Sequence, residues 1–366
     1  MRTIDGKIAV LVVEDSPAAR LLLIHLLTSD PRFGVVDAVD NGAEALRFLE
    51  GGRPDVILMD IHMSGMDGYE VTRRIMETRP VPVVICSATV DPAEVASTFR
   101  ALEAGAVAVV AKPAGPGHPD HEASAAKLLE IVALMSEVRV IKRWPRLRRS
   151  TGTTSAIVPA NGRSQEGPIQ VVAIGASTGG PPVLQTILAS LPASFPVPVL
   201  IVQHIAAGFL PGFAEWLSHG TGFPVRIAAH GEVLLPGHAY LAPDGCHMGL
   251  APHGRIALSR QSPENGVRPA VSFLFRSVAA ECGSRAVAIL LTGMGRDGVT
   301  ELKLLRDAGA VTVAQDAESS VVHGMPGEAI RCGGASHVLG PDKIAALLTG
   351  LLAAPSRPAL VPTTKR

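Results

Sequence analysis

Five polar side chains in the first third of the sequence each follow an apolar run. Glu14 and Asp15 follow the first run, Asp60 the third, Ser87 the fourth and Lys112 the fifth. If these runs are parallel strands, their carboxyl ends meet at one edge of a sheet. Clustered carboxylates repel one another unless a hard divalent cation such as Mg²⁺ neutralises them. An aspartate in such a cluster can accept a phosphoryl group, and a lysine can pair with the phosphoryl oxygens. A single Asp or Ser can simply cap a helix, but the five together favour a phosphorylation site.

A second candidate site begins at Ser177, in a Gly-x-Ser-x-Gly segment between an apolar run and a helix-like segment. This pattern is typical of a nucleophile elbow, whose sharp turn exposes the serine hydroxyl at a helix N-terminus. Two alternatives remain: a turn that holds an anion, or a plain turn. The spacing differs from those of the known phosphate-binding loops.

A serine nucleophile needs a base and an acid that orients the base. His204 directly follows the apolar run 199–203, and Asp297 lies in the Gly-rich loop 291–298. Taken singly, His204 could be structural and Asp297 could cap the helix that follows it. The order Ser, His, Asp also differs from the Ser, Asp, His order of α/β-hydrolases, so a lipase-like fold is not expected.

The elements that must position the first cluster alternate along the chain. Short, nearly continuous apolar runs predict strands buried on both faces, and repeated βα units predict a parallel, doubly wound sheet. The predicted strands are 7–13, 34–39, 54–59, 82–86 and 107–111, and the predicted helices are 18–27, 43–49, 69–78, 94–104 and 124–140.

A second α/β region begins near residue 169. Gly- and Pro-rich turns between short apolar segments predict a hairpin excursion within 230–259. Residues 150–167 are rich in Ser, Thr, Gly and Pro and are interpreted as a linker, and the polar tail after 354 is expected to be disordered. The other predicted strands are 171–174, 197–202 and 286–291, and the predicted helices are 182–190, 270–282, 299–308 and 341–352.

The composition fits two globular domains in a reducing compartment. The 366 residues carry 33 basic and 33 acidic side chains, a balance that does not call for a nucleic-acid partner. The basic run 139–149 is interpreted as a solvated helix end rather than a nucleic-acid site. The four cysteines are widely spaced, the N-terminus lacks a signal peptide pattern, and no apolar run reaches the ~20 residues of a membrane span. We therefore expect a cytoplasmic protein without membrane insertion.

The first region resembles a two-component receiver domain, a flavodoxin-like fold with five parallel strands. The resemblance rests on Glu14-Asp15-Ser16, Met59-Asp60, Gly65-Met66-Asp67-Gly68, Ser87 and Lys112-Pro113. It implies that Asp60 is the phosphoacceptor, that Glu14, Asp15 and Asp60 bind Mg²⁺, and that Ser87 and Lys112 sense the phosphoryl group. Two positions depart from the family: Ser64 replaces the usual proline, and Val109 stands near the usual aromatic switch residue.

The second region resembles the catalytic domain of the chemotaxis protein-glutamate methylesterase, the CheB family. The matching segments are 175–181, 203–205, 236–243, 291–298, 314–316 and 322–326. The resemblance implies a catalytic triad of Ser177, His204 and Asp297, with the Met294 N–H stabilising the oxyanion and Thr178 shaping the site. Ala270 and Ser272 stand where the family commonly has Ser and Asp, and Glu301 stands where a Gly is usual.

Together the two resemblances imply an enzyme in four segments: a receiver domain at 1–122, its last helix and the linker at 123–167, a doubly wound α/β methylesterase domain at 168–352, and a tail at 353–366. They imply phosphorylation-activated hydrolysis of glutamyl γ-methyl esters, and deamidation of glutamines, on chemoreceptor helices. A chemotaxis histidine kinase would be the phosphodonor, and ester hydrolysis would need no cofactor. The alternatives are a phosphorylation-gated hydrolase of another protein ester or amide, and a non-catalytic binding module.

Overall fold

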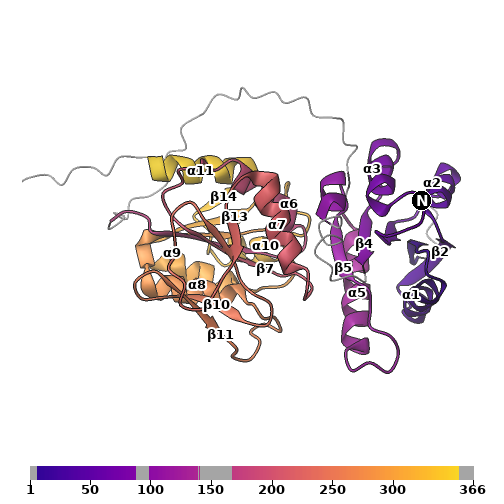
Figure 1. The fold of residues 1–366 in the computed structure, drawn as a ribbon, viewed down its shortest axis with the longest axis horizontal. Coiled ribbons are helices and arrows are strands. Elements are labelled where there is room, and N and C mark those ends of the chain that lie inside the picture. The colour runs from indigo at the N-terminus through magenta and orange to yellow at the C-terminus, as the bar shows by residue number, and fades with distance from the viewer. Residues whose placement is uncertain (1–5, 88–98, 139, 141–166, 354–366) are drawn as a thin grey trace, which may run out of the picture.

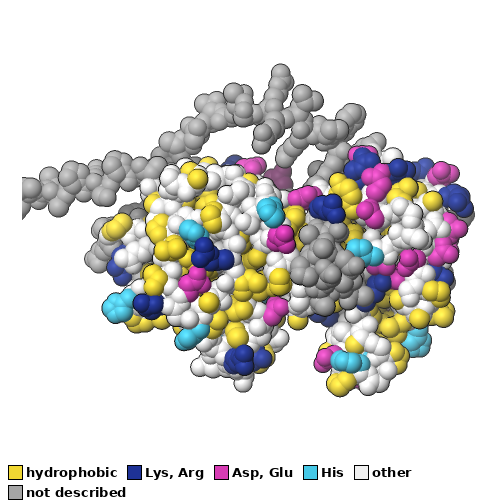
Figure 2. All heavy atoms as spheres, viewed as in Figure 1, with side chains coloured by type: hydrophobic (Ala, Val, Ile, Leu, Met, Phe, Trp, Pro, Cys, Tyr) yellow, Lys and Arg dark blue, Asp and Glu magenta, His cyan; other side chains and the backbone are white. Residues whose placement is uncertain are grey.

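A computed structural model describes residues 6–87, 99–138, 140 and 167–353. It has an N-terminal lobe and a larger second lobe, and β5 and α5 lie on the side of the first lobe that faces the second (Figure 1). On the face shown in Figure 2, charged side chains are more densely grouped over the first lobe than over the second. Residues 150–166 of the predicted linker, the basic run 139–149 apart from residue 140, and the tail after 354 lie outside the described residues. No helix in the described ranges is long and apolar enough to cross a membrane.

The first lobe contains the predicted sheet of five parallel strands, in the order β2-β1-β3-β4-β5. Its central strands are fully buried, which explains their continuous apolar sequence. Of the predicted helix 94–104, only 99–104 is described, and it is helical. The elements are β1 (Ile8–Val13), α1 (Pro17–Ser29), β2 (Phe33–Val39), α2 (Gly42–Gly51), β3 (Val56–Met59), α3 (Gly68–Thr78), β4 (Val83–Ser87), β5 (Ala108–Ala111) and α5 (His121–Ser136).

The second lobe is built on a sheet of seven strands, in the order β14-β13-β12-β6-β7-β9-β8. All pairs in this sheet are parallel, so the predicted doubly wound α/β class is confirmed. The strands are β6 (Val171–Ala176), β7 (Val199–Gln203), β8 (Val225–Ile227), β9 (Ala239–Leu241), β12 (Ala286–Leu290), β13 (Val311–Gln315) and β14 (His337–Leu339), and the helices are α6 (Gly180–Ala189), α7 (Leu210–Thr221), α8 (Val271–Glu281), α9 (Val299–Asp307), α10 (Met325–Arg331) and α11 (Pro341–Ala353).

The predicted hairpin within 230–259 is present but shorter than expected. The antiparallel pair consists of β10 (His247–Ala251) and β11 (Arg255–Ser259). Strand β9, which lies in the same stretch of sequence, instead joins the main sheet in parallel beside β7. The excursion therefore begins after β9.

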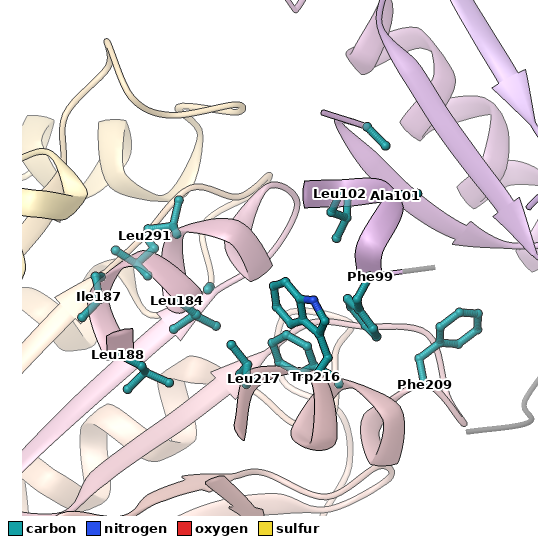
Figure 3. Packing of buried hydrophobic residues seen from close by; sticks show 14 of the residues in the cluster. Phe99, Ala101, Leu102, Leu184, Ile187, Leu188, Phe209, Trp216, Leu217 and Leu291 are labelled. Carbon is teal, nitrogen blue, oxygen red and sulfur yellow. The ribbon is translucent and has the colours of Figure 1, made fainter. Parts of the chain in front are cut away.

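The two lobes share buried side chains. Phe99 and Leu102 of the first lobe belong to the same hydrophobic cluster as Phe213, Trp216 and Leu217 of α7. Figure 3 shows Phe99 beside Trp216, and Leu102 on the same helical segment as Phe99. The Phe99 and Trp216 rings are stacked with their centroids 5.3 Å apart.

Candidate functional site

Three neighbouring strands of the large sheet deliver the candidate catalytic residues. Strands β12, β6 and β7 are adjacent, and their carboxyl ends lie at one edge. Ser177 follows β6, His204 follows β7, and Asp297 lies in the loop that follows β12. The parallel register therefore places three loops, far apart in sequence, at one edge of the sheet.

The segment around Ser177 is a tight strand-to-helix turn. The Ser177 N–H donates to the Thr292 carbonyl at 3.0 Å, and the Ser177 carbonyl accepts from Gly180 N at 2.9 Å. Gly179 has a φ of 80°, in the left-handed region that glycine adopts most easily. A Cβ at Gly179 would also lie 2.6 Å from Val321 Cβ. Glycine at this position is thus required both by the backbone conformation and by the packing.

His204 contacts Asp297 through one ring nitrogen. His204 Nε2 lies 3.0 Å from Asp297 Oδ2, and the two side chains are 15% and 5% exposed. This contact leaves His204 Nδ1 as the nitrogen available to a second partner. Ser177 and His204 line the same cavity, although in the described part of the chain no hydrogen bond joins their side chains.

Asp297 is held by two backbone N–H groups and an amide side chain in addition to His204. Val271 N donates at 2.6 Å, Ser272 N at 3.0 Å and Asn265 Nδ2 at 3.1 Å. Burial raises the pKa of Asp297, but the hydrogen bonds from His204 and Ser272 outweigh this effect and lower the pKa to about 2. The carboxylate is therefore ionised at neutral pH.

The idea that Asp297 caps the helix following it is wrong. That helix, α9, has Gly298 as its N-cap and no side-chain cap hydrogen bond. Asp297 instead accepts the N–H groups of the first two residues of α8, Val271 and Ser272. One carboxylate thus stabilises the start of α8 and contacts His204.

Thr178 follows Ser177 in the turn after β6, and Met294 lies in the loop after β12, next to Gly293, where an added Cβ would be 2.6 Å from Ser177 Cβ. The Thr178 carbonyl accepts from Thr292 Oγ1 at 2.9 Å, which ties the turn after β6 to the loop after β12. Within the described residues the Met294 N–H donates to no other backbone group, whereas the Ser177 N–H is engaged by Thr292. Of these two amides, Met294 N–H is the one available to an incoming oxygen.

The cavity at Ser177 is lined by both lobes. Val109 and Ala111 of β5 and Lys127 of α5 line it together with Ser177 and His204. Val109, which stands near the usual aromatic switch position, thus lines the same cavity as the candidate catalytic residues. Met294 and Val321 also pack against a buried cluster that includes Val110 and Leu128 of the first lobe.

The carboxyl ends of the first lobe's strands bring together the predicted acidic residues, and this group is called the acidic rim. Ligand atoms of Glu14, Asp15 and Asp60 lie within 4.8 Å of one another. Lys112 Nζ lies 2.7 Å from Glu14 Oε2 and 3.0 Å from Asp60 Oδ2. Ser87, at the end of β4, is buried.

Charge is unevenly balanced at this rim. Burial raises the pKa of Glu14, and Asp60 adds to the rise while Lys112 opposes it. Burial by itself lowers the pKa of Lys112, but the two carboxylates outweigh it, so its pKa is raised. Three carboxylates beside one ammonium leave excess negative charge, and their oxygens are the ligands that Mg²⁺ prefers. The donor set thus fits a magnesium ion.

Ser272 and Glu301, two of the three departures in the second region, both make polar contacts. Ser272 Oγ accepts from Asn265 Nδ2 at 3.1 Å and from Gly298 N at 2.9 Å. Glu301 pairs with Arg276 at 3.2 Å, and Arg276 also pairs with Glu264, the neighbour of Asn265. Ser64, the departure in the first region, donates its N–H to Asp15 at 3.4 Å.

The sequence assigned no role to several polar residues that contact the site loops, although residues 203 and 315 lie in segments that match the family. Gln203 contacts the backbone of Ser177 and His204, Gln315 accepts from Thr292 N, and Asn265 contacts Asp297. Gln203 ends β7, directly before His204, and Gln315 ends β13, the strand beside β12, so their places at strand ends could have marked them. For Asn265, only the Asn-Gly pair and its φ of 53° single it out, and the angle comes from the structure.

Comparison with known proteins agrees with both lobes. A family model described as CheB methylesterase matches residues 172–348, and one described as response regulator receiver domain matches residues 10–119. The protein-glutamate methylesterase/protein-glutamine glutaminase of Nitrosospira multiformis is 55% identical over 346 residues, which cover 94% of this chain and 97% of that protein. A protein-glutamate methylesterase/protein-glutamine glutaminase of Geobacter metallireducens is 54% identical over 349 residues, covering 94% and 99%.

Among solved structures, the crystal structure of the Thermotoga maritima CheB methylesterase catalytic domain is 39% identical and covers 50% of this chain and 98% of that domain, with a TM-score of 0.49. The full-length relatives are similar to this chain across both lobes rather than in one domain alone. The chain therefore belongs to the CheB family of protein-glutamate methylesterases that carry a response regulator receiver domain.

Proposed function

We propose that this chain hydrolyses glutamyl γ-methyl esters on chemoreceptors, deamidates receptor glutamines, and is controlled by phosphorylation of Asp60. The observation that carries the proposal is the joint placement of Ser177 and His204 in one cavity, with Asp297 bound to His204 Nε2. This arrangement supports nucleophilic catalysis by a Ser-His-Asp triad.

In the proposed reaction, His204 Nδ1 takes the proton from Ser177 Oγ as this oxygen attacks the ester carbonyl. The Met294 N–H stabilises the negative charge that develops on the carbonyl oxygen. The protonated imidazole then gives its proton to the leaving methoxide, and methanol departs. For a glutamine substrate the leaving group is ammonia.

Hydrolysis of the acyl-enzyme repeats the sequence with water. His204 takes a proton from the water, hydroxide attacks the acyl carbon, and Ser177 Oγ is released with the proton returned by His204. Asp297 keeps the imidazole in the tautomer with Nε2 protonated and stabilises its positive charge. Thr178 shapes the cavity through the bond between its carbonyl and Thr292.

In the first lobe, Asp60 would accept a phosphoryl group from a chemotaxis histidine kinase, with Glu14, Asp15 and Asp60 holding Mg²⁺. The ion supplies charge neutralisation for the incoming phosphoryl oxygens. Lys112 pairs with those oxygens in place of its present bond to Asp60, and Ser87 contacts them from β4. The cavity lined by β5, α5, Ser177 and His204 supports inhibition by the unphosphorylated receiver.

The proposed domains are a receiver at 1–122, its last helix and a linker at 123–167, a methylesterase domain at 168–352 and a tail at 353–366. We propose a cytoplasmic location. The four cysteines, Cys86, Cys246, Cys282 and Cys332, are all unpaired, as a reducing compartment requires.

The proposal is tested by incubating a methylated receptor fragment with the protein, acetyl phosphate and Mg²⁺, and following methyl-ester loss by mass spectrometry. We expect the unaltered protein to remove methyl groups, Ser177→Ala to remove none, and Asp60→Asn to ignore acetyl phosphate. Turnover of a simple ester without turnover of the receptor would indicate another substrate. Inactivity on both would indicate a binding module.

A further inference from the structure

Gln203 is a buried amide that contacts the backbone of both proposed catalytic residues. It ends β7, directly before His204, and is 5% exposed. Its Nε2 donates to the Ser177 carbonyl at 2.8 Å and to the His204 carbonyl at 2.8 Å. A single side-chain nitrogen thus links two loops that follow different strands.

The orientation of this amide is fixed by its surroundings. Exchanging its oxygen and nitrogen would place Oε1 against two carbonyl oxygens, which have no hydrogen to donate. In the observed orientation Oε1 is buried and has no hydrogen-bond partner within the described ranges. Oε1 lies against Gly180, where a Cβ would be 2.2 Å away. The first turn of α6 therefore leaves room for this amide only because residue 180 is glycine.

A side chain that served packing alone would not need this arrangement. A buried acceptor without a partner is unfavourable, and an apolar side chain of the same length would avoid it. What the amide provides instead is two donors aimed at the loops that carry Ser177 and His204. Violations of local rules of this kind are expected where function requires them.

We infer that Gln203 is a positioning residue that sets the separation between Ser177 Oγ and the His204 ring. The inference rests on the proposed function of these two residues. Proton transfer from serine to histidine needs the two groups at hydrogen-bond distance, and a displacement of about 1 Å can cost about 10²-fold in rate. Without the two hydrogen bonds from Gln203, the turn after β6 and the loop after β7 lose their direct side-chain connection.

The test uses full-length protein with acetyl phosphate and Mg²⁺ and compares Gln203→Met and Gln203→Glu with the unaltered chain. Methionine keeps the length and removes both donors, and an ionised glutamate adds repulsion toward the two carbonyls. A matched control is Thr312→Val. Thr312 is buried on β13, away from the site, and its hydroxyl accepts from Ser336 N at 2.9 Å. The measurements are the rate of Ser177 labelling by a fluorophosphonate, kcat and KM on a methylated receptor fragment, and the melting temperature.

We expect Gln203→Met to lower labelling and kcat by about 10²-fold, with KM within about threefold of the original. Gln203→Glu should be slower still, and Thr312→Val should lose stability but keep its rates. Labelling by both Gln203 variants at the rate of Thr312→Val would overturn the inference and leave Gln203 a packing residue. If either variant fails to fold, the other decides.

The two proposals can fail separately. If the unaltered protein is labelled at Ser177 but does not demethylate the receptor, the proposed substrate is wrong while the labelling rates still test Gln203. If the unaltered protein is not labelled, Ser177 is not a nucleophile, and the inference about Gln203 falls with it.

Discussion

His204 Nε2 and the backbone N–H of Val271 meet at the same oxygen of Asp297, at 3.0 Å and 2.6 Å. The carboxylate thus couples the orientation of an imidazole on the loop after β7 to the start of α8. Because its pKa is lowered to about 2, it is ionised at neutral pH and can stabilise a positive charge on His204. The same charge is favourable at the N-terminus of α8.

Asp297→Asn should lower the rate of ester hydrolysis by about 10⁴-fold, because an amide cannot hold the imidazole in the required tautomer. Loss of the charged cap on α8 should also cost about 1 kcal/mol of folding free energy. Initial rates and urea denaturation measure the two effects. The control is Asp307→Asn, at an exposed carboxylate that pairs with Lys303. It should change the hydrolysis rate and the folding free energy only slightly. A loss of stability without a loss of rate would make Asp297 a cap alone.

Gly293→Ala should impair catalysis by displacing Ser177. A Cβ at position 293 would lie 2.6 Å from Ser177 Cβ and 2.5 Å from Met325 Sδ. Overpacking of this kind costs about 1–3 kcal/mol, and here the displaced atom belongs to the proposed nucleophile. Fluorophosphonate labelling should slow by at least about tenfold, the expected result of a shift of a few tenths of an ångström. The control is Gly350→Ala, in α11, where the added methyl group meets open space. This variant should keep its labelling rate, and its free energy of unfolding should rise by up to about 1 kcal/mol. Equal labelling of both variants would show that the turn absorbs the added methyl group.

Much of the fold was predictable because many of its strands are buried on both faces. The runs that became β1, β3, β6 and β12 are nearly continuous in apolar residues, many of them Val or Ile, so their strand character is visible locally. Strands β8 and β9 have three residues each and carry no such signal. Helix α7 was missed because Gly212 and Gly220 lower its intrinsic helix propensity, whereas burial of Phe213 and Leu217 overrides that preference.

The candidate site was predictable to the extent that side-chain chemistry marks it. Ser177, His204 and Asp297 follow strands that the sheet places side by side, so strand order alone brings their loops to one edge. The contacts of Gln203 were not predictable, because both its partners are backbone carbonyls that no sequence pattern identifies. The donors of Asp297 on α8 were missed for the same reason.

Mg²⁺ should stabilise the first lobe against unfolding. At a Mg²⁺ concentration of ten times Kd, the expected gain is about 1.4 kcal/mol, and a titration of the melting temperature measures it. Because the pKa of Glu14 is raised, protons compete with the ion more strongly than at an ordinary carboxylate, so the gain should shrink as the pH falls toward 5. Asp15→Asn should abolish most of the gain. Asp37→Asn, at an exposed position on β2, should retain it, and equal loss in both would indicate a non-specific salt effect.

Phe99→Ala should raise esterase activity in the absence of any phosphodonor. Phe99 stacks on Trp216 and lies 5.0 Å from the Phe213 ring, and nearby Glu103 accepts hydrogen bonds from Trp216 and Gln185. These contacts join the receiver to α6 and α7, beside the cavity that holds Ser177. Coupling energies of ~1–3 kcal/mol correspond to roughly 5–150-fold, and with Val109 in place of a ring we expect the lower end of that range. Basal methyl-ester release measures the effect, and a fragment beginning at Gly167 sets its upper limit.

The control is Phe48→Ala, on α2, which perturbs the same lobe away from α6 and α7 and should leave basal activity unchanged. If Phe99→Ala and the fragment are no more active than the unphosphorylated chain, the receiver does not cover the site, and phosphorylation must act by recruiting the enzyme to its substrate.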